Sequence, residues 1–155
     1  MEMKDKKFKL LLILISFSIF CYHIFNLFHL WSDIPSQITI HFTDGEPGSK
    51  FFLFVMPIIS VFIWFLVGLF VRNPEKLNYV NLTEENKDIQ YSRTQSVMIL
   101  IQNVSFMTFI FANEALLDNA VGMESSLPIA ISIVCLVICF IAPLYLLVWA
   151  ATLKY

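Results

Sequence analysis

Four long apolar stretches dominate the sequence and restrict what the chain can fold into. They occupy residues 8–31, 51–71, 97–117 and 128–153, and each contains at most one charged residue. A helix needs about 20 apolar residues to cross the roughly 30 Å hydrocarbon core of a bilayer, so every stretch is long enough. Backbone amides in lipid must be satisfied within their own segment, which predicts helices and excludes an open sheet. We therefore predict an all-α membrane protein, a four-transmembrane-helix bundle forming a single domain over residues 1–155.

The composition explains why a soluble fold is not expected. Apolar residues make up 58% of the chain, against about 45–50% in soluble domains, and 16 of them are Phe. Charged residues make up only 14%, with a formal net charge of −2. A chain of 155 residues cannot bury that much apolar surface within itself, so the lipid bilayer is its expected partner. The composition disfavours nucleic-acid binding, a secreted disulfide scaffold and most soluble enzymes.

The basic residues predict the orientation of the bundle. Nine of the ten lie in the N-terminal segment, in the connection 72–96 or at the C-terminus, whereas Lys50 alone lies in the connection 32–50. Basic residues accumulate on the cytoplasmic side of membrane proteins. Both termini and the inner connection 72–96 are therefore predicted to face the cytoplasm (N-in/C-in), and residues 32–50 form an outer loop.

Polar residues lie inside two of the predicted helices, where lipid makes their burial costly. Helical spacing places the polar residues of segment 8–31 on a stripe towards its outer end, and those of segment 97–117 along one side of that helix. Both sets reach a similar depth near the outer interface. The candidates for a polar intramembrane pocket are Tyr22, His23, Asn26, His29, Asn103, Asn113 and Glu114.

Three interpretations of these polar residues stay open at the level of sequence. They could hydrogen-bond one helix to another, line an outward-facing pocket, or bind zinc through His23, His29, His41 and Glu114. Interhelical hydrogen bonding is the interpretation that we favour. The sequence contains no recognised constellation of nucleophile, base and metal ligand. No catalytic residue, metal or cofactor is predicted, and a small intramembrane metal-dependent enzyme or ion pathway is the least favoured function.

The predicted outer loop alternates apolar and polar residues before a turn signal. Ile38, Ile40 and Phe42 are separated by polar residues, which predicts a short strand or an extended interfacial segment. The pair Asp44-Gly45 is typical of a turn. The loop is expected to be ordered or interfacial and to pack back on the bundle, or else to present a recognition surface.

The inner connection carries a helix-start signal. Thr83 precedes Glu84 and Glu85, a pattern typical of an N-cap followed by acidic residues in the first turn. The helix is predicted to continue through Gln90 into segment 97–117, so that it begins a few turns inside the cytoplasm. Its surface is a candidate docking site for a cytoplasmic partner.

Two motifs in these connections resemble a known family. The first reads Ile34-Pro35-x-x-Ile38-x-Ile40-His41-Phe42, then Gly45-Glu46-Pro47, and follows the first predicted helix. The second reads Asn73-Pro74-x-x-x-Asn78-Tyr79, then Thr83-Glu84-Glu85-Asn86 and Gln90-Tyr91. In this order and spacing they resemble the SdpI-like bacterial membrane proteins, over about residues 10–117.

The resemblance implies a non-enzymatic, multi-pass protein of the bacterial cytoplasmic membrane that gives protection against, or senses, an extracellular antimicrobial peptide. It implies partner-binding positions in both connections, namely Pro35, Ile40, His41, Phe42, Gly45, Asn78, Tyr79, Asn86 and Gln90. The expected partners are a toxin peptide outside and a cytoplasmic regulator or membrane protein inside, with a homo-oligomer as a further expectation. The alternative function is that of an accessory or oligomeric subunit in a membrane transport or signalling assembly.

Overall fold

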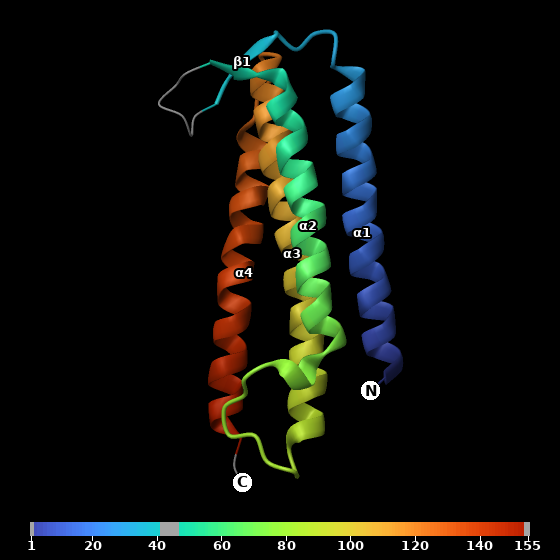
Figure 1. The fold of residues 1–155 in the computed structure, drawn as a ribbon, viewed down its shortest axis with the longest axis vertical. Helices are drawn as coiled ribbons and strands as arrows, with labels where there is room; N and C mark the ends of the chain where they lie inside the picture. Colours follow the sequence, from blue (N-terminus) through green and yellow to red (C-terminus); the bar gives the residue numbers. More distant parts are fainter. Residues whose placement is uncertain (1, 41–46, 154–155) are drawn as a thin grey trace.

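The computed structural model describes residues 2–40 and 47–153, with side chains from residue 6 onward. Four long helices run side by side along the molecule, and two short strands lie across one end (Figure 1). The helices and strands are α1 (Glu2–His29), β1 (Gln37–Thr39), β2 (Pro47–Ser49), α2 (Val55–Arg72), α3 (Lys87–Ala120) and α4 (Ser126–Thr152). Short 3-10 helices, η1 (Lys50–Phe54) and η2 (Pro74–Lys76), precede and follow α2.

All four helices are long and apolar enough to cross a membrane, which confirms the predicted four-helix organisation. The candidate spans are Lys6–His29, Lys50–Arg72, Lys87–Ala120 and Ser126–Thr152. Their mean hydropathy runs from 1.5 in α3 to 2.9 in α4. α3 is the least apolar of the four because it carries most of the buried polar side chains.

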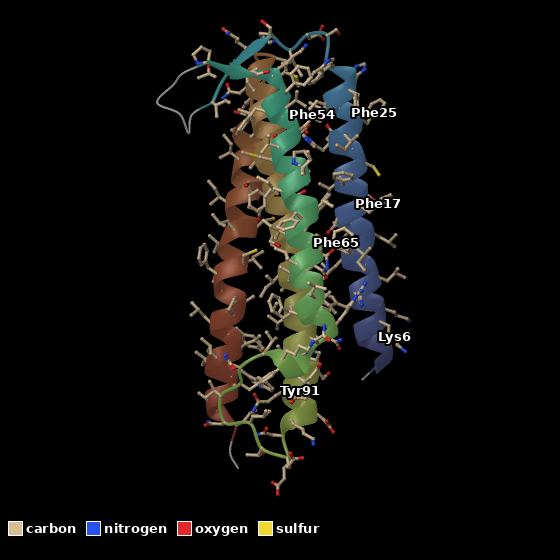
Figure 2. All side chains as sticks on the ribbon, viewed as in Figure 1. Lys6, Phe17, Phe25, Phe54, Phe65 and Tyr91 are labelled. Carbon is tan, nitrogen blue, oxygen red and sulfur yellow. The ribbon has the colours of Figure 1, made fainter. Side chains whose placement is uncertain are left out.

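α3 is the central helix, and α1, α2 and α4 each pack against it. Its buried residues extend from Gln90 near its beginning to Asp118 near its end. The other three helices leave most of their Phe, Leu, Ile and Val side chains exposed, and these project outward along the whole bundle (Figure 2). Polar groups at the centre and an apolar exterior are the arrangement expected of a protein whose solvent is lipid.

β1 and β2 form a small antiparallel cap at one end of the bundle, with Ile38 opposite Gly48. The strand predicted from the alternation of apolar residues is therefore confirmed at Gln37–Thr39. The side chain of Ile40, directly after β1, occupies the space beside Gly48, where an added Cβ atom would lie 2.2 Å from its Cδ1. The cap closes over a hydrophobic core of Leu27, Ile34, Ile38, Ile40, Leu53 and Leu117.

Both ends of the chain and the connection between α2 and α3 lie at the opposite end of the bundle from the cap (Figure 1). An even number of helices running in alternating directions produces this arrangement. The termini therefore share one side of the molecule, and the cap lies on the other.

The helix boundaries differ from the predicted ones mainly around α3. The prediction that this helix extends beyond its apolar segment is confirmed, since α3 begins at Lys87. The prediction that Thr83 is its N-cap is wrong, because the N-cap is Asn86. Oδ1 of Asn86 accepts a hydrogen bond from the backbone N–H of Thr83 at 2.9 Å, which folds the acidic residues between them into a turn.

Candidate functional site

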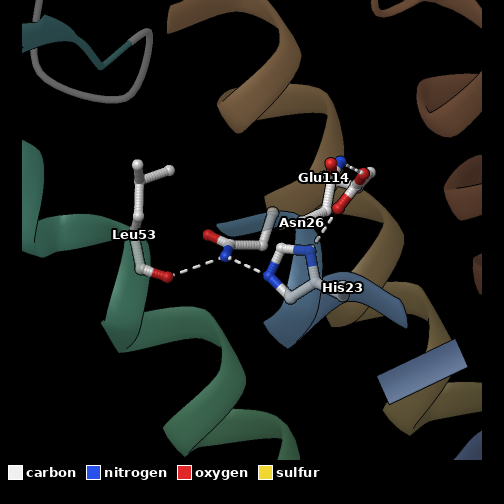
Figure 3. A network of polar contacts seen from close by, with 5 residues as sticks. His23, Asn26, Leu53 and Glu114 are labelled. Atoms are coloured by element: carbon white, nitrogen blue, oxygen red, sulfur yellow. Dashed lines mark hydrogen bonds and ion pairs between the residues drawn. The ribbon is translucent and has the colours of Figure 1, made fainter. Parts of the chain in front are cut away.

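A buried polar network joins α1, α3 and η1 close to the cap. Nδ1 of His23 contacts Oε2 of Glu114, and Nδ2 of Asn26 donates to Oε1 of the same carboxylate. On the other side of the imidazole, Nδ2 of Asn113 lies 2.8 Å from Nε2 of His23. The same amide nitrogen donates to the carbonyl oxygen of Leu53 at 2.7 Å (Figure 3). The contacts form one continuous chain across three elements.

Simple helix geometry explains how two helices supply this network. His23 and Asn26 are three residues apart in α1, so they lie on one face. Asn113 and Glu114 are adjacent in α3, where successive side chains diverge by about 100°. They therefore reach the two nitrogens of one imidazole from different sides. His23 and Asn113 are 1% and 0% exposed, and Glu114 is 6% exposed.

The contacts leave little freedom for chemistry. The pattern fits an imidazole that carries its proton on Nδ1, donates it to Glu114 and accepts from Asn113 at Nε2. Both ring nitrogens of His23 and both oxygens of Glu114 then have partners within the chain. Only Oδ1 of Asn113 is buried without a hydrogen-bond partner among the described side chains. The network is built to hold helices together, which supports the favoured interpretation of interhelical hydrogen bonding.

Three of the predicted pocket residues do not belong to the network, and two of these, Tyr22 and His29, are exposed. Tyr22 is 63% exposed on the outside of α1, and His29 is exposed and stacks on Phe25 with ring centroids 5.8 Å apart. Placing them in a polar pocket between the two helices was wrong. The buried face of α1 passes through Ser16, His23 and Leu27 instead, so the stripe through Tyr22 and His29 faces the surroundings.

Asn103 is fully buried but lies apart from the network, ten residues before Asn113 in α3. Oγ of Ser16 donates to its Oδ1 at 3.0 Å, and its own Nδ2 donates to the carbonyl oxygen of Ile99 at 2.8 Å. Asn103 therefore forms a second, separate polar contact between α1 and α3. A single continuous pocket through all seven predicted residues does not form.

The zinc hypothesis fails at one of its four residues. His29 points away from His23 and Glu114, and His41 lies outside the described residues. Over residues 6–40 and 47–153, no group of three or more His, Cys, Asp or Glu side chains is placed to hold a metal ion.

Sequence reasoning missed two participants near this site. Asp118 is 7% exposed and lies one turn after Glu114, just beyond the predicted segment 97–117. Its spacing of four residues from Glu114 is the signal that could have found it. The carbonyl oxygen of Leu53 also takes part, and no side-chain pattern could have indicated a backbone acceptor.

The partner-binding residues predicted in the connection between α1 and α2 differ in their exposure. Pro35 is exposed. Ile40 is only 5% exposed, so its assignment to partner binding was wrong: the side chain fills the core beneath the cap, against Gly48. His41, Phe42 and Gly45 lie outside the described residues.

In the connection between α2 and α3, two predicted partner-binding residues shape the start of α3 instead. Oδ1 of Asn86 accepts from Nε2 of Gln90 at 3.1 Å, and Nδ2 of Asn86 donates to the carbonyl oxygen of Asn81 at 2.9 Å. Gln90 is 1% exposed and also reaches the carbonyl oxygen of Val80 at 3.2 Å. Assigning Gln90 to a partner was therefore wrong, because its amide is occupied in holding the connection onto α3.

Asn78 and Tyr79 lie at the surface of the same connection. Asn78 is exposed, and Tyr79 is half-buried with its ring centroid 5.1 Å from that of Tyr91. The Tyr79 hydroxyl donates to the carbonyl oxygen of Pro74 at 2.7 Å. Burial raises the pKa of the Tyr79 phenol, partly opposed by a hydrogen bond with the Thr94 side chain.

Both motif regions thus meet the same helix at its opposite ends. The first motif region packs on Leu117 through the core of the cap, and the second is hydrogen-bonded to Gln90 and packs on Tyr91. No protein-family model, curated protein or solved structure matches this chain.

Proposed function

We propose that this chain is a non-enzymatic, receptor-like protein of the bacterial cytoplasmic membrane that protects against or senses an extracellular antimicrobial peptide. In this proposal the cap faces outward, and both termini and the connection between α2 and α3 face the cytoplasm. The position of the basic residues supports the orientation. The two motifs that resemble the SdpI-like family support the role.

The observation that carries the proposal is that one uninterrupted helix joins the two motif regions. α3 has 34 residues and is therefore about 50 Å long. Leu117 is fully buried beneath the cap, and Tyr91 packs on Tyr79 near the other end. A peptide that binds the cap and shifts it would move the outer end of α3. A rigid helix with a packed contact at each end can pass that shift to the inner connection.

The occupied hydrogen bonds of the network favour binding over catalysis. A catalytic imidazole or carboxylate needs a free atom within reach of a substrate. Here the polar atoms of His23 and Glu114 are already hydrogen-bonded to each other and to two asparagines. The side chains therefore serve better as a clamp that positions the cap than as a reaction centre.

A tolerance assay tests the role. The chain is expressed in a sensitive Gram-positive host that lacks such proteins, and the cells are challenged with a panel of secreted bacteriocins. We expect protection against at least one peptide, lost in Pro35→Ala and in His41→Ala but retained in Glu124→Ala, which changes an exposed residue of the connection between α3 and α4. Immunoblots of membrane fractions check equal insertion. If the wild-type chain is inserted but protects against none of the peptides, the result would contradict the proposal for that panel.

The orientation has its own test. Ser36 and Asn78 are both exposed and lie in the two motif regions at opposite ends of the bundle. With the three native cysteines replaced by alanine, Ser36→Cys should react with a membrane-impermeant maleimide in intact cells. Asn78→Cys should react only after the cells are opened. The reverse pattern would place the cap in the cytoplasm.

A further inference from the structure

A groove runs between α1 and α2, from the middle of the bundle towards the end where the chain termini lie. It consists of two adjoining cavities that share Ile13, Trp64 and Phe65 in their walls. The cavity nearer the middle of the bundle, which forms the deep end of the groove, has a volume of about 390 Å³, and its lining includes Phe17, Phe20, Val61 and Phe106. The cavity nearer the chain termini, which forms the shallow end, has a volume of about 100 Å³, and its lining includes Lys9, Gly68, Arg72 and Gln102.

The groove exists because α1 and α2 pack chiefly on α3. α2 is fastened to α3 by Gln102, whose Nε2 donates to the carbonyl oxygen of Trp64 at 2.9 Å. The Phe20 ring of α1 packs on Phe106 of α3, with centroids 5.7 Å apart. Phe17 of α1 and Phe65 of α2 lie at neighbouring heights on the two sides of the groove (Figure 2), and each is 63% exposed. The groove is therefore open sideways, towards the space that lipid occupies.

The two ends of the groove differ in chemistry. The deep part is walled almost wholly by aromatic and aliphatic side chains, and its two polar residues, Ser16 and Asn103, are hydrogen-bonded to each other at 3.0 Å. The shallow part carries Lys9 on one wall and Arg72 on the other. No acidic side chain lines either cavity, and neither cation forms an ion pair with a described residue. The shallow end is thus positive and the deep end apolar.

The length of the groove matches one leaflet of a bilayer. Phe20 follows Lys9 by eleven residues, and Val61 precedes Arg72 by the same number. Eleven helical residues rise about 16 Å, which is about half of the roughly 30 Å hydrocarbon core. With the two cations at the interface, the apolar end of the groove therefore reaches about the midplane of the membrane.

We propose that this groove binds an anionic phospholipid from the leaflet on the side of the chain termini. The phosphate lies between Lys9 and Arg72, and an acyl chain lies along Ile13, Phe17 and Phe65. Basic pockets between membrane helices bind the head groups of anionic lipids, and here the charge and the apolar wall are continuous. The proposal is independent of any role in peptide recognition.

Lipid binding to the full chain tests the proposal. The purified protein in a zwitterionic detergent is titrated with phosphatidylglycerol or with phosphatidylcholine carrying the same acyl chains. Retained lipid is counted by native mass spectrometry, and the Tm is followed in parallel. We expect phosphatidylglycerol to bind more tightly and to raise the Tm more. Each basic residue near the head group contributes about fivefold, so Lys9→Gln with Arg72→Gln should weaken phosphatidylglycerol binding about twenty-fivefold.

A matched control separates a site from general surface charge. Lys7→Gln with Lys76→Gln removes the same charge from the same end of the bundle, at exposed residues that line neither cavity. This control should keep nearly all of the preference for phosphatidylglycerol. Equal binding of the two lipids by the wild-type chain would overturn the proposal. So would a control variant that loses as much affinity as the groove variant.

A third variant tests the acyl-chain part of the site. Val61→Trp fills the deep cavity without changing charge and should lower the retention of both lipids, with the helical circular dichroism unchanged. Inorganic phosphate, which has no acyl chain, should not raise the Tm. Stabilisation by inorganic phosphate as strong as that by phosphatidylglycerol would show a bare anion site and overturn the lipid assignment.

Discussion

The two halves of α1 meet the rest of the molecule in different ways. The half nearest the cap, which is the outer half in the proposed orientation, is held to α3 by His23 and Asn26, which both contact Glu114. Its inner half has one side-chain hydrogen bond to α3 among the described residues, from Ser16, and then runs beside the open groove. Apolar contact alone gives helices in lipid little reason to associate, because lipid tails are as apolar as the side chains. α1 is therefore clamped where it is polar and held less firmly where it is apolar.

The clamp at the outer end also includes the cap. Asn113 binds the backbone of Leu53 as well as His23, so one amide connects α1, α3 and η1. Leu27, Leu53 and Leu117 pack directly around this point, and each is fully buried. Polar network and apolar core thus form one rigid unit, for which the inner half of α1 has no equivalent.

Removing the central carboxylate should weaken the attachment of α1 near the cap more than any other change. Glu114→Ala leaves the buried Nδ1–H of His23 and the half-buried amide of Asn26 without their shared acceptor. A buried donor left without its acceptor costs about 1–3 kcal/mol, so we expect the free energy of unfolding in an SDS titration to fall by about 2–6 kcal/mol. Glu124→Ala, at an exposed glutamate, should change it by less than about 0.5 kcal/mol. Similar losses in the two variants would show that the network does not act as a clamp.

A paired replacement sharpens the same test. When both members of the pair become apolar, no imidazole is left without its acceptor, Asn26 loses its partner in the single and the double variant alike, and Asn113 keeps the carbonyl oxygen of Leu53. His23→Leu combined with Glu114→Leu should therefore be more stable than Glu114→Leu alone. A double variant that is less stable than the single one would mean that the two side chains do not compensate each other's burial.

Asn113→Ala should have the next largest effect and should act on the cap. It leaves Nε2 of His23 and the carbonyl oxygen of Leu53 without a donor, at a cost of about 1–3 kcal/mol. Hydrogen exchange should speed up in β1 and η1 while it stays unchanged at the start of α3. Asn119→Ala, at an exposed amide six residues later in α3, is the control. Unchanged hydrogen exchange in the cap would show that the polar network does not stabilise the cap.

The sequence alone predicts the helices far better than their faces. The four apolar segments and the strand at Ile38 could be found because bilayer thickness and side-chain alternation are direct constraints. The inward face of α1 could not, because its polar stripe is ambiguous: Tyr22 and His23 are neighbours, and only the position of Glu114 on α3 decides which one turns inward. Long-range partners select the face, and one sequence does not contain them.

The partner-binding predictions show the same limit. Ile40 and Gln90 belong to motifs, but they are buried and occupied by contacts within the chain. A motif position can serve the fold or a partner, and only burial distinguishes the two. Exposed motif residues such as Pro35 and Asn78 are therefore the better candidates for contact with another molecule.

In the inner half of α1, we expect a smaller loss of stability, because only one hydrogen bond is removed. Ser16→Ala removes the donor to Oδ1 of Asn103. Hydrogen bonds between membrane helices contribute about 0.6 kcal/mol on average, and we expect a loss of that size in the free energy of unfolding. Ser18→Ala, at an exposed serine of the same helix, should cost less. A loss as large as that of Asn113→Ala would mean that the inner half is clamped as firmly as the outer half.

The smallest effect is expected at the inner end of the molecule and appears only at alkaline pH. Burial raises the pKa of Tyr79 above its ordinary value of 10.0, so the folded state holds the phenolic proton more tightly than the unfolded state. The resulting stability is fully present below about pH 10 and is lost as the pH rises through the raised pKa of the folded state. Tyr79→Phe should flatten the decline in Tm above about pH 10, whereas the neighbouring exposed variant Asn78→Ala should keep it. If the Tm of Tyr79→Phe falls as steeply as that of the wild-type chain, deprotonation of Tyr79 does not loosen this connection. The groove would then be the only evidence that the rest of the molecule is held less firmly than the cap.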